Sequence, residues 1–195
     1  MRERRPGDWR VDLARRHPLE SNVEAALDDH PALTRLGSRT ASLDRLDFAV
    51  LGPGDRLCEL ELKAKHQPYR SWADLRPGVA ERDLFILDEL ALRKVIDAGR
   101  YAFLLVNDQP TNRWVLWTTM DLVLATKVRV NRRLATGIDR LKAKVLLDLA
   151  DSPHHYDTLV AALSAMASAL RVIDRHWTDI GPWPSNRPID TVGAA

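Results

Sequence analysis

The chain has 195 residues, a length that corresponds to one domain, or to one domain with a small appendage. Apolar residues make up 45% and charged residues 29%, as expected for a soluble globular chain with a full core. A single cysteine excludes an internal disulfide, and no apolar run approaches the ~18 residues that a membrane span needs. The arginine-rich start lacks the apolar stretch of a signal peptide, so we expect a cytoplasmic protein that is not bound to a membrane.

Positive charge is concentrated in two segments, although the formal net charge is only +2. Residues Met1 to Arg16 contain six arginines against three acids, and Lys127 to Lys144 contain seven Lys or Arg residues against Asp139 alone. Such segments suit a polyanionic partner, and they are equally consistent with a solvated face.

The first expected helix covers Pro18 to Asp29, since Pro18 suits a first helical turn and apolar residues follow a helical period. Glu20 and Glu24 lie one turn apart beside this apolar stripe. Glu24 has two possible roles, because Ser21 to Glu24 is also a capping-box pattern in which Glu24 would only cap the helix.

A β-hairpin is predicted next, after a connection with an optional short strand at Arg39 to Leu43. Its strands cover Leu46 to Leu51 and Arg56 to Ala64, and Gly52-Pro53-Gly54-Asp55 has the residues of a tight turn. Cys58 is expected to be a reduced thiol on the apolar face of the second strand.

The second half of the chain begins with an expected helix at Glu81 to Ala98, followed by strands at Tyr101 to Val106 and Arg113 to Thr118. A strand, a helix and a buried strand form a crossover unit, which implies a parallel strand pair in a mixed sheet. A helix is then expected to begin in Asp121 to Lys127, and a last packing helix is expected at Tyr156 to His176. His154 and His155 are expected at its start, on the surface.

Two carboxylates and an amine converge in the predicted hairpin. Residues two apart on a strand share a face, so Glu61 and Lys63 point the same way, and Asp47 can reach them from the neighbouring strand. Such a group suits a divalent cation beside a group that handles protons or stabilises charge. Glu59 shares this face and could also approach the metal, and Asp44 competes with Asp47 for the first position.

This arrangement resembles the PD-(D/E)XK nuclease superfamily over residues 18–118. The family motif is an acid on one strand and acid-x-Lys on the next, here Asp47 and Glu61-Leu62-Lys63, and Leu46 stands where the family name has proline. The resemblance implies an α/β (α+β) fold with a restriction-endonuclease-like mixed central sheet flanked by helices. Around the nuclease-like core (18–120) that the resemblance implies, the sequence predicts a basic N-terminal arm (1–17), a helical C-terminal extension packed on the core (121–180) and a loose tail (181–195).

The resemblance also implies a site and a reaction. Asp47, Glu61 and the backbone carbonyl of Leu62 would bind Mg²⁺, for which Mn²⁺ could substitute, and whether Glu59 joins them is open. Lys63 would orient the attacking water or stabilise developing charge, and Glu24, or Glu20 in its place, would be the acid from the first helix. The implied activity is hydrolysis of DNA to a 5′-phosphate and a 3′-hydroxyl, in defence, restriction, repair or recombination.

DNA is the expected partner, and no small-molecule cofactor is expected. A homodimer is consistent with cutting two strands. One alternative is a non-catalytic nuclease-fold protein that binds nucleic acid or regulates a defence or repair complex, and another is an RNase or a junction resolvase. A charged edge strand without a site is the structural alternative. The residues predicted to contact nucleic acid are Lys65, Gln67, Arg129, Arg132, Arg133, Arg140, Lys142 and Lys144.

Overall fold

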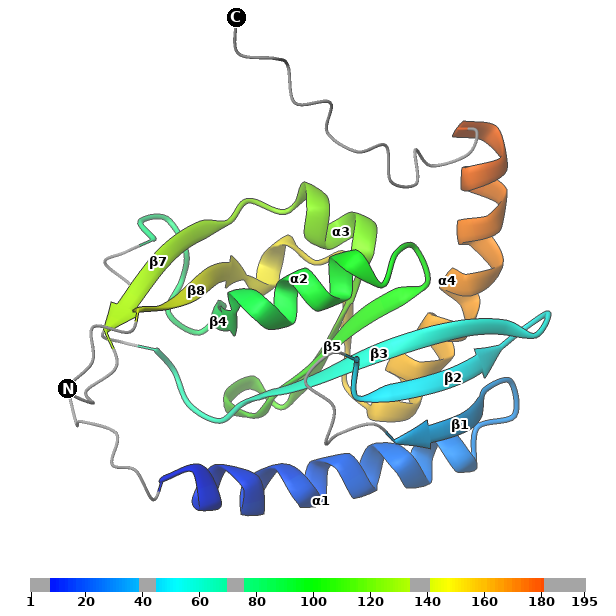
Figure 1. Ribbon diagram of the computed structural model, residues 1–195, viewed down its shortest axis with the longest axis horizontal. Helices are drawn as coiled ribbons and strands as arrows, with labels where there is room; N and C mark the ends of the chain where they lie inside the picture. The colour runs from blue at the N-terminus through cyan, green and yellow to red at the C-terminus, as the bar shows by residue number, and fades with distance from the viewer. Residues whose placement is uncertain (1–7, 39–44, 70–75, 134–140, 181–195) are drawn as a thin grey trace, which may run out of the picture.

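A mixed β-sheet lies at the centre of the computed structural model, which describes residues 8–38, 45–69, 76–133 and 141–180. Within these residues its six strands follow the order β1-β2-β3-β5-β6-β9 (Figure 1). The expected mixed α/β fold is therefore confirmed. The strands are β1 (Thr34–Ser38), β2 (Phe48–Gly52), β3 (Arg56–Lys65), β5 (Ala102–Asp108), β6 (Arg113–Thr118) and β9 (His154–Tyr156).

The predicted hairpin is present as β2 and β3, which pair antiparallel with Phe48 opposite Leu60. Gly54 and Asp55 adopt positive φ angles of 72° and 56° in its turn, a conformation that glycine adopts freely and that aspartate tolerates better than most residues. This turn fixes the register that places alternate β3 residues on opposite faces of the sheet.

A crossover connects β3 to the parallel strand β5, as the sequence predicted. It contains a strand, β4 (Leu84–Asp88), followed by the helix α2 (Glu89–Asp97). The expectation of one helix from Glu81 to Ala98 was therefore wrong in its first half. The residues of β4 pair with a strand about sixty positions later in the chain, a contact that a local helical period cannot reveal.

A second, three-stranded sheet has the order β4-β8-β7 in the described part of the chain. Its other strands are β7 (Val128–Arg133) and β8 (Leu141–Asp148). The predicted helical extension at 121–180 is thus largely wrong, because these two strands lie between the helices α3 (Thr119–Leu124) and α4 (Leu159–Ile180). The strand β9 in turn pairs with β6, so this segment belongs to the core, and His154 and His155 lie in a strand.

Two apolar layers cover the two faces of the central sheet. On one face, α1 (Asp8–Asp28) and α4 pack on residues such as Leu60, Leu62 and Phe103. On the other face, α2 and strands of the second sheet pack on residues such as Leu104 and Trp117. Figure 1 shows α1 on one side of β2 and β3 and α2 on the other. Along β3, even-numbered residues such as Leu60 and Leu62 therefore face α1, and odd-numbered residues face α2.

Several element boundaries differ from the sequence predictions. The helix α1 begins at Asp8 and contains Pro18, so 8–17 of the predicted arm are helical, while residues 1–7 lie outside the described residues. The strand β1 begins at Thr34, and residues 39–44, with Asp44, are outside the described part, as is the predicted tail at 181–195. Within the described residues, no helix combines the length and apolarity that crossing a membrane would require.

Candidate active site

Asp47, Glu61 and Lys63 meet on the face of the central sheet that is covered by α2. Asp47 lies just before β2, and its Oδ2 accepts a hydrogen bond from the backbone N–H of Leu62 at 2.9 Å. The ammonium group of Lys63 contacts Glu61 Oε1 directly and lies 3.8 Å from Asp47 Oδ2. The hairpin therefore brings together the three side chains that the sequence motif selected.

Both carboxylates are withdrawn from solvent. Asp47 is 4% and Glu61 is 3% exposed, whereas the side chain of Lys63 is 27% exposed. The other oxygen of Glu61, Oε2, is buried and accepts no hydrogen bond from any described residue. Since a buried carboxylate oxygen without a hydrogen bond is unfavourable, Glu61 Oε2 is a candidate ligand for a cation.

A second lysine approaches this oxygen, and the sequence analysis missed it. Lys94 is on α2, and its Nζ lies 3.9 Å from Glu61 Oε2, an ion-pair distance that is too long for a hydrogen bond. Two carboxylates thus face two ammonium groups. The spacing of Lys94 in the sequence carries no signal for this role, because only the crossover from β3 to β5 places α2 above Glu61.

The donor set fits a hard divalent cation in its chemistry. Magnesium binds through one or two carboxylates and keeps several waters, and Asp47 and Glu61 supply that number. The carbonyl of Leu62 lies beside them and accepts a hydrogen bond from Lys63 Nζ at 3.1 Å. No group of three or more His, Cys, Asp or Glu side chains suited to a metal occurs among the described residues, so the site offers a two-acid set.

The first helix does not contribute to this site. Its residues Leu19, Val23 and Leu27 are buried against the opposite face of the sheet, so α1 lies across the sheet from Asp47 and Glu61. Glu24 lies 3.8 Å from Arg35 Nη1 in an ion pair. The prediction that Glu24, or Glu20 in its place, supplies an acid to the site is therefore wrong for this structure.

Glu59 lies on the same face of β3 as Glu61 and is half-buried. Glu59 lies one strand repeat beyond Glu61, about 7 Å along β3, on the side away from Lys63. Burial, and secondarily the charge of Glu59, raises the pKa of the Cys58 thiol to about 12. Cys58 packs on the α1 side of the sheet, as expected for an inert reduced thiol. A role of Glu59 in metal binding stays a prediction.

Lys65 was predicted to contact nucleic acid, and this is wrong because its side chain is fully buried. Its Nζ lies 3.4 Å from Asp108 Oδ1 and donates to the backbone carbonyl of Arg82. Burial lowers the pKa of Lys65, and Asp108 opposes this shift. Gln67 follows β3 and is exposed, so its side chain remains accessible to a ligand.

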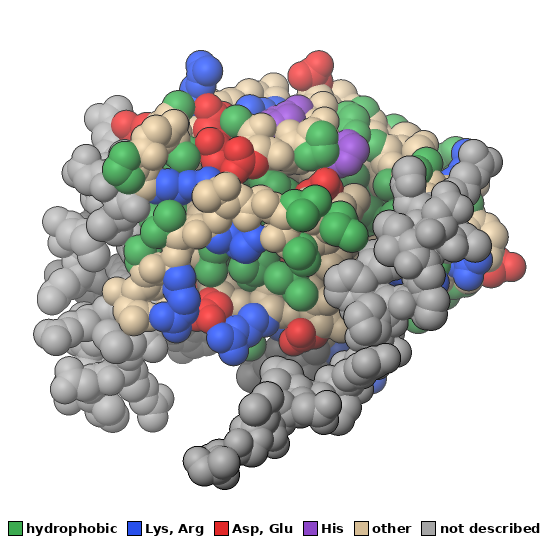
Figure 2. Space-filling view, turned by 90° about the horizontal axis from the view of Figure 1, so that it is seen from above, with side chains coloured by type: hydrophobic (Ala, Val, Ile, Leu, Met, Phe, Trp, Pro, Cys, Tyr) green, Lys and Arg blue, Asp and Glu red, His purple; other side chains and the backbone are tan. Residues whose placement is uncertain are grey.

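The basic segment Lys127 to Lys144 is less available to nucleic acid than its composition suggested, because two of its cations are engaged in ion pairs. Arg129 donates to Glu89 at 2.9 Å, and the ammonium group of Lys144 contacts Asp88. Figure 2 shows a face on which the described Lys and Arg side chains are interspersed with acidic and apolar ones. Arg132 and Lys142 are backbone partners in β7 and β8, Arg133 ends β7, and Arg140 lies outside the described residues.

The chain was compared with protein-family models, with curated proteins and with solved structures. None of the three comparisons gave a match. The functional argument therefore depends on the site itself.

Proposed function

We propose that this protein is a metal-dependent nuclease that hydrolyses phosphodiester bonds in DNA. The observation that carries the proposal is the meeting of Asp47, Glu61 and Lys63 on one buried sheet face, where Glu61 Oε2 accepts no hydrogen bond from a described residue. The order of the surrounding elements supports it, because the acid-bearing strand, the acid-x-Lys strand and the crossover to a parallel strand occur as the family resemblance implies.

Asp47 and Glu61 would hold Mg²⁺ with the carbonyl of Leu62 beside them. When bound, this ion polarises the scissile phosphate and lowers the pKa of a coordinated water. The ammonium group of Lys63 contacts Glu61 and lies 3.8 Å from Asp47, so it would have to turn away from them when a cation is held there. Lys63 is more exposed than either Asp47 or Glu61. Its reoriented ammonium group can hydrogen-bond the attacking water or a phosphate oxygen.

Hydrolysis adds water across the bond between phosphorus and the 3′ oxygen. The water oxygen attacks phosphorus and loses its proton, the bond to the 3′ oxygen breaks, and that oxygen gains a proton. A 5′-phosphate and a 3′-hydroxyl result, the products that the resemblance implies. Lys94 adds positive charge beside Glu61, where charge develops on the phosphate oxygens.

The test is cleavage by the purified protein of supercoiled DNA, linear DNA, single-stranded DNA and RNA, each with Mg²⁺, Mn²⁺ or EDTA. We expect metal-dependent cleavage of at least one DNA form, and a loss of at least about a hundredfold in Lys63→Met and Asp47→Asn, as expected when a transition-state contact is removed. Asp55→Asn is the matched control, since Asp55 is an exposed acid in the turn of the same hairpin and Asn tolerates its positive φ.

Equal activity in the wild type and both site variants would contradict the proposal, as would no activity on any substrate. The second outcome, together with intact binding of DNA, is what the non-catalytic alternative predicts. Glu59→Gln tests whether Glu59 is a metal ligand. If it is, this variant needs more Mg²⁺ to reach its half-maximal rate than Asp55→Asn does.

A further inference from the structure

A polar pocket of about 420 Å³ opens at the ends of β3 and β5, separate from the acids of the candidate active site. It is on the same side of the central sheet, because Lys65 behind it occupies the next position after Lys63 on that face of β3. The two positions are about 7 Å apart along the strand. The pocket is lined by Arg82, Asp83, Thr111, Arg113, Ala150 and His155.

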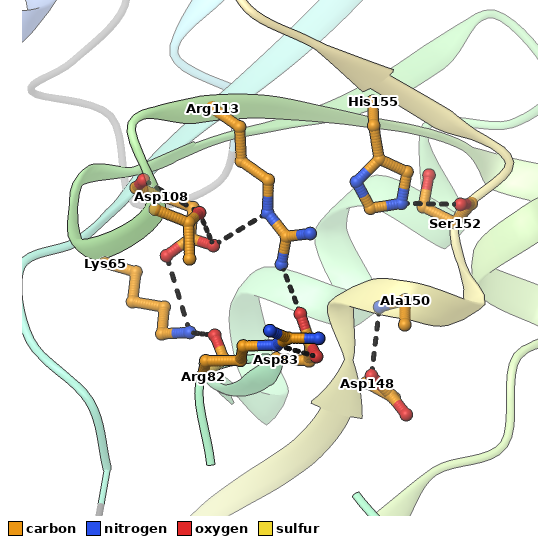
Figure 3. Close-up of polar contacts among 10 residues, drawn as sticks. Lys65, Arg82, Asp83, Asp108, Arg113, Asp148, Ala150, Ser152 and His155 are labelled. Carbon is orange, nitrogen blue, oxygen red and sulfur yellow. Dashed lines mark hydrogen bonds and ion pairs between the residues drawn. The ribbon is translucent and has the colours of Figure 1, made fainter. Parts of the chain in front are cut away.

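Arg113 is held rigidly at the base of this pocket. Its Nε donates to Asp108 Oδ2 at 2.9 Å, and its Nη2 donates to Asp83 Oδ1 at 2.6 Å. The third nitrogen, Nη1, has no partner among the described residues, and Figure 3 shows it directed away from both carboxylates. Asp108 is itself fixed from behind by Lys65 and by Thr111, whose Oγ1 donates at 2.6 Å.

Two further groups, Arg82 and His155, line the same space. The side chain of Arg82 is 78% exposed, and only its Nε is engaged by a described residue, at 3.3 Å from Asp83. His155 Nε2 donates to the carbonyl of Ser152 at 2.8 Å, which fixes the ring, and Figure 3 shows Nδ1 directed toward Arg113. Nδ1 is an acceptor in the neutral ring and donates only in the imidazolium form. A guanidinium nitrogen held in place, an exposed guanidinium and an imidazole therefore converge on one opening.

The guanidinium donors of the cluster, rather than its net charge, suit an anion. Ion pairs join three cations, Lys65, Arg82 and Arg113, to two carboxylates, Asp83 and Asp108. A third carboxylate, Asp148, lies beside them and accepts from the backbone N–H of Ala150. The side chain of Arg113 is 22% exposed, so Nη1 at the opening can hydrogen-bond a ligand oxygen. Free guanidinium nitrogens in this arrangement match the oxygens of a phosphate group.

The geometry points to a phosphate subsite in this pocket, which holds a phosphate group of the nucleic-acid strand other than the one that is cleaved. The nucleic-acid identity of the ligand rests on the proposed function, whereas the phosphate chemistry rests on the pocket. The phosphate is either an internal phosphodiester or a terminal phosphate. Because the subsite and the Lys63 site share one sheet face, the subsite would fix the register of a strand across the acids.

The experiment measures binding in EDTA, so that cleavage does not enter. Fluorescence anisotropy would follow the binding of labelled single-stranded and duplex oligonucleotides that carry a 5′-phosphate, a 3′-phosphate or neither. The variants are Arg82→Ala and His155→Gln, with Arg171→Ala as the control, since Arg171 is an exposed arginine on α4, across the sheet. Arg82→Ala retains the backbone carbonyl that Lys65 contacts, and unchanged melting temperatures would show that the variants fold.

We expect Arg82→Ala to weaken binding about five- to tenfold, as for the loss of a charge-assisted hydrogen bond at a partly exposed site. The slope of log affinity against log salt should fall by about one. Equal losses for all oligonucleotides identify an internal phosphodiester, and a loss confined to one phosphorylated end identifies a terminal phosphate. Arg171→Ala should bind as the wild type does.

Binding of every oligonucleotide by Arg82→Ala and His155→Gln as tightly as by Arg171→Ala would overturn the inference. With oligonucleotide binding unchanged, a shift of the His155 ring resonances on adding inorganic phosphate would not rescue the inference. Such a shift would show an adventitious ion only. Failure of the Lys63→Met cleavage test would leave these binding results intact, so the two proposals fail separately.

Discussion

Removal of the Lys63 ammonium group should destabilise the metal-free protein and leave the metal-bound protein nearly unaffected. Lys63→Met keeps most of the apolar stem and removes the charge that contacts Glu61 and lies 3.8 Å from Asp47. Among the described residues, Lys94 then remains as the ion-pair partner of Glu61, 3.9 Å from its Oε2. A divalent cation would replace the lost charge.

The size of the effect follows from burial. Truncating one partner of a fully buried ion pair costs about 3–5 kcal/mol. Lys63 is 27% exposed and Lys94 remains, so we expect about 1–3 kcal/mol. For a chain of this size each kcal/mol corresponds to about 2–4 °C, which predicts a fall in melting temperature of roughly 2–12 °C in EDTA.

Differential scanning calorimetry in EDTA and in Mg²⁺ measures both effects. A ligand at about a hundred times its Kd stabilises the folded state by about 2.7 kcal/mol, so Mg²⁺ should restore most of the loss in Lys63→Met. Glu61→Gln, which removes a predicted ligand, should gain little from Mg²⁺. Equal Mg²⁺-dependent gains in Lys63→Met and Glu61→Gln would refute the reasoning, because they would place the metal elsewhere.

Three other predictions test the surrounding structure. Gly52→Ala should lose about 1–3 kcal/mol in urea unfolding, because a Cβ there would lie 2.3 Å from Leu170 Cδ1 in the core, whereas Gly37→Ala, with nothing within 4 Å, should be nearly neutral. Cys58 should resist a thiol reagent in the native state and react on unfolding, since burial raises its pKa to about 12. Burial tends to raise the pKa of Asp83, but hydrogen bonds from two arginines outweigh it and hold this pKa below 3.8. The ionised carboxylate therefore stabilises the fold above pH 3.8, and this contribution is lost as the pH falls through the pKa of the folded state. The stability difference between the wild type and Asp83→Asn should shrink over the same fall in pH.

Local patterns predicted the part of the fold that carries the site. The turn residues from Gly52 to Asp55 and the alternation along β3 fix the hairpin and its faces, and both depend on near neighbours in the chain. The apolar run of β5 and the helix before it imply a parallel crossover through general chain geometry. Asp47, Glu61 and Lys63 could therefore be brought together from the sequence.

Non-local pairing explains what the sequence could not reveal. The segment Leu84–Asp88 shares its apolar spacing with the helix that follows, and its strand conformation depends on pairing with β8. Lys142 and Lys144 obscured β8, because charged residues in a strand resemble a solvated loop until a partner such as Asp88 is known. Lys65 failed as a predicted ligand contact for the same reason, since Asp108 is distant in the chain.

The misplaced helical acid shows what the site uses instead. An apolar stripe predicts that a helix packs on a sheet but not on which face, and α1 packs across the sheet from Glu61. The helix above the acids is α2, which contributes a lysine, Lys94. Glu61 has two ammonium groups within 4 Å, and Asp47 has that of Lys63. A metal at the proposed site would have to displace an internal cation, which would separate metal binding from folding, in contrast to structural metal sites where the two are one event.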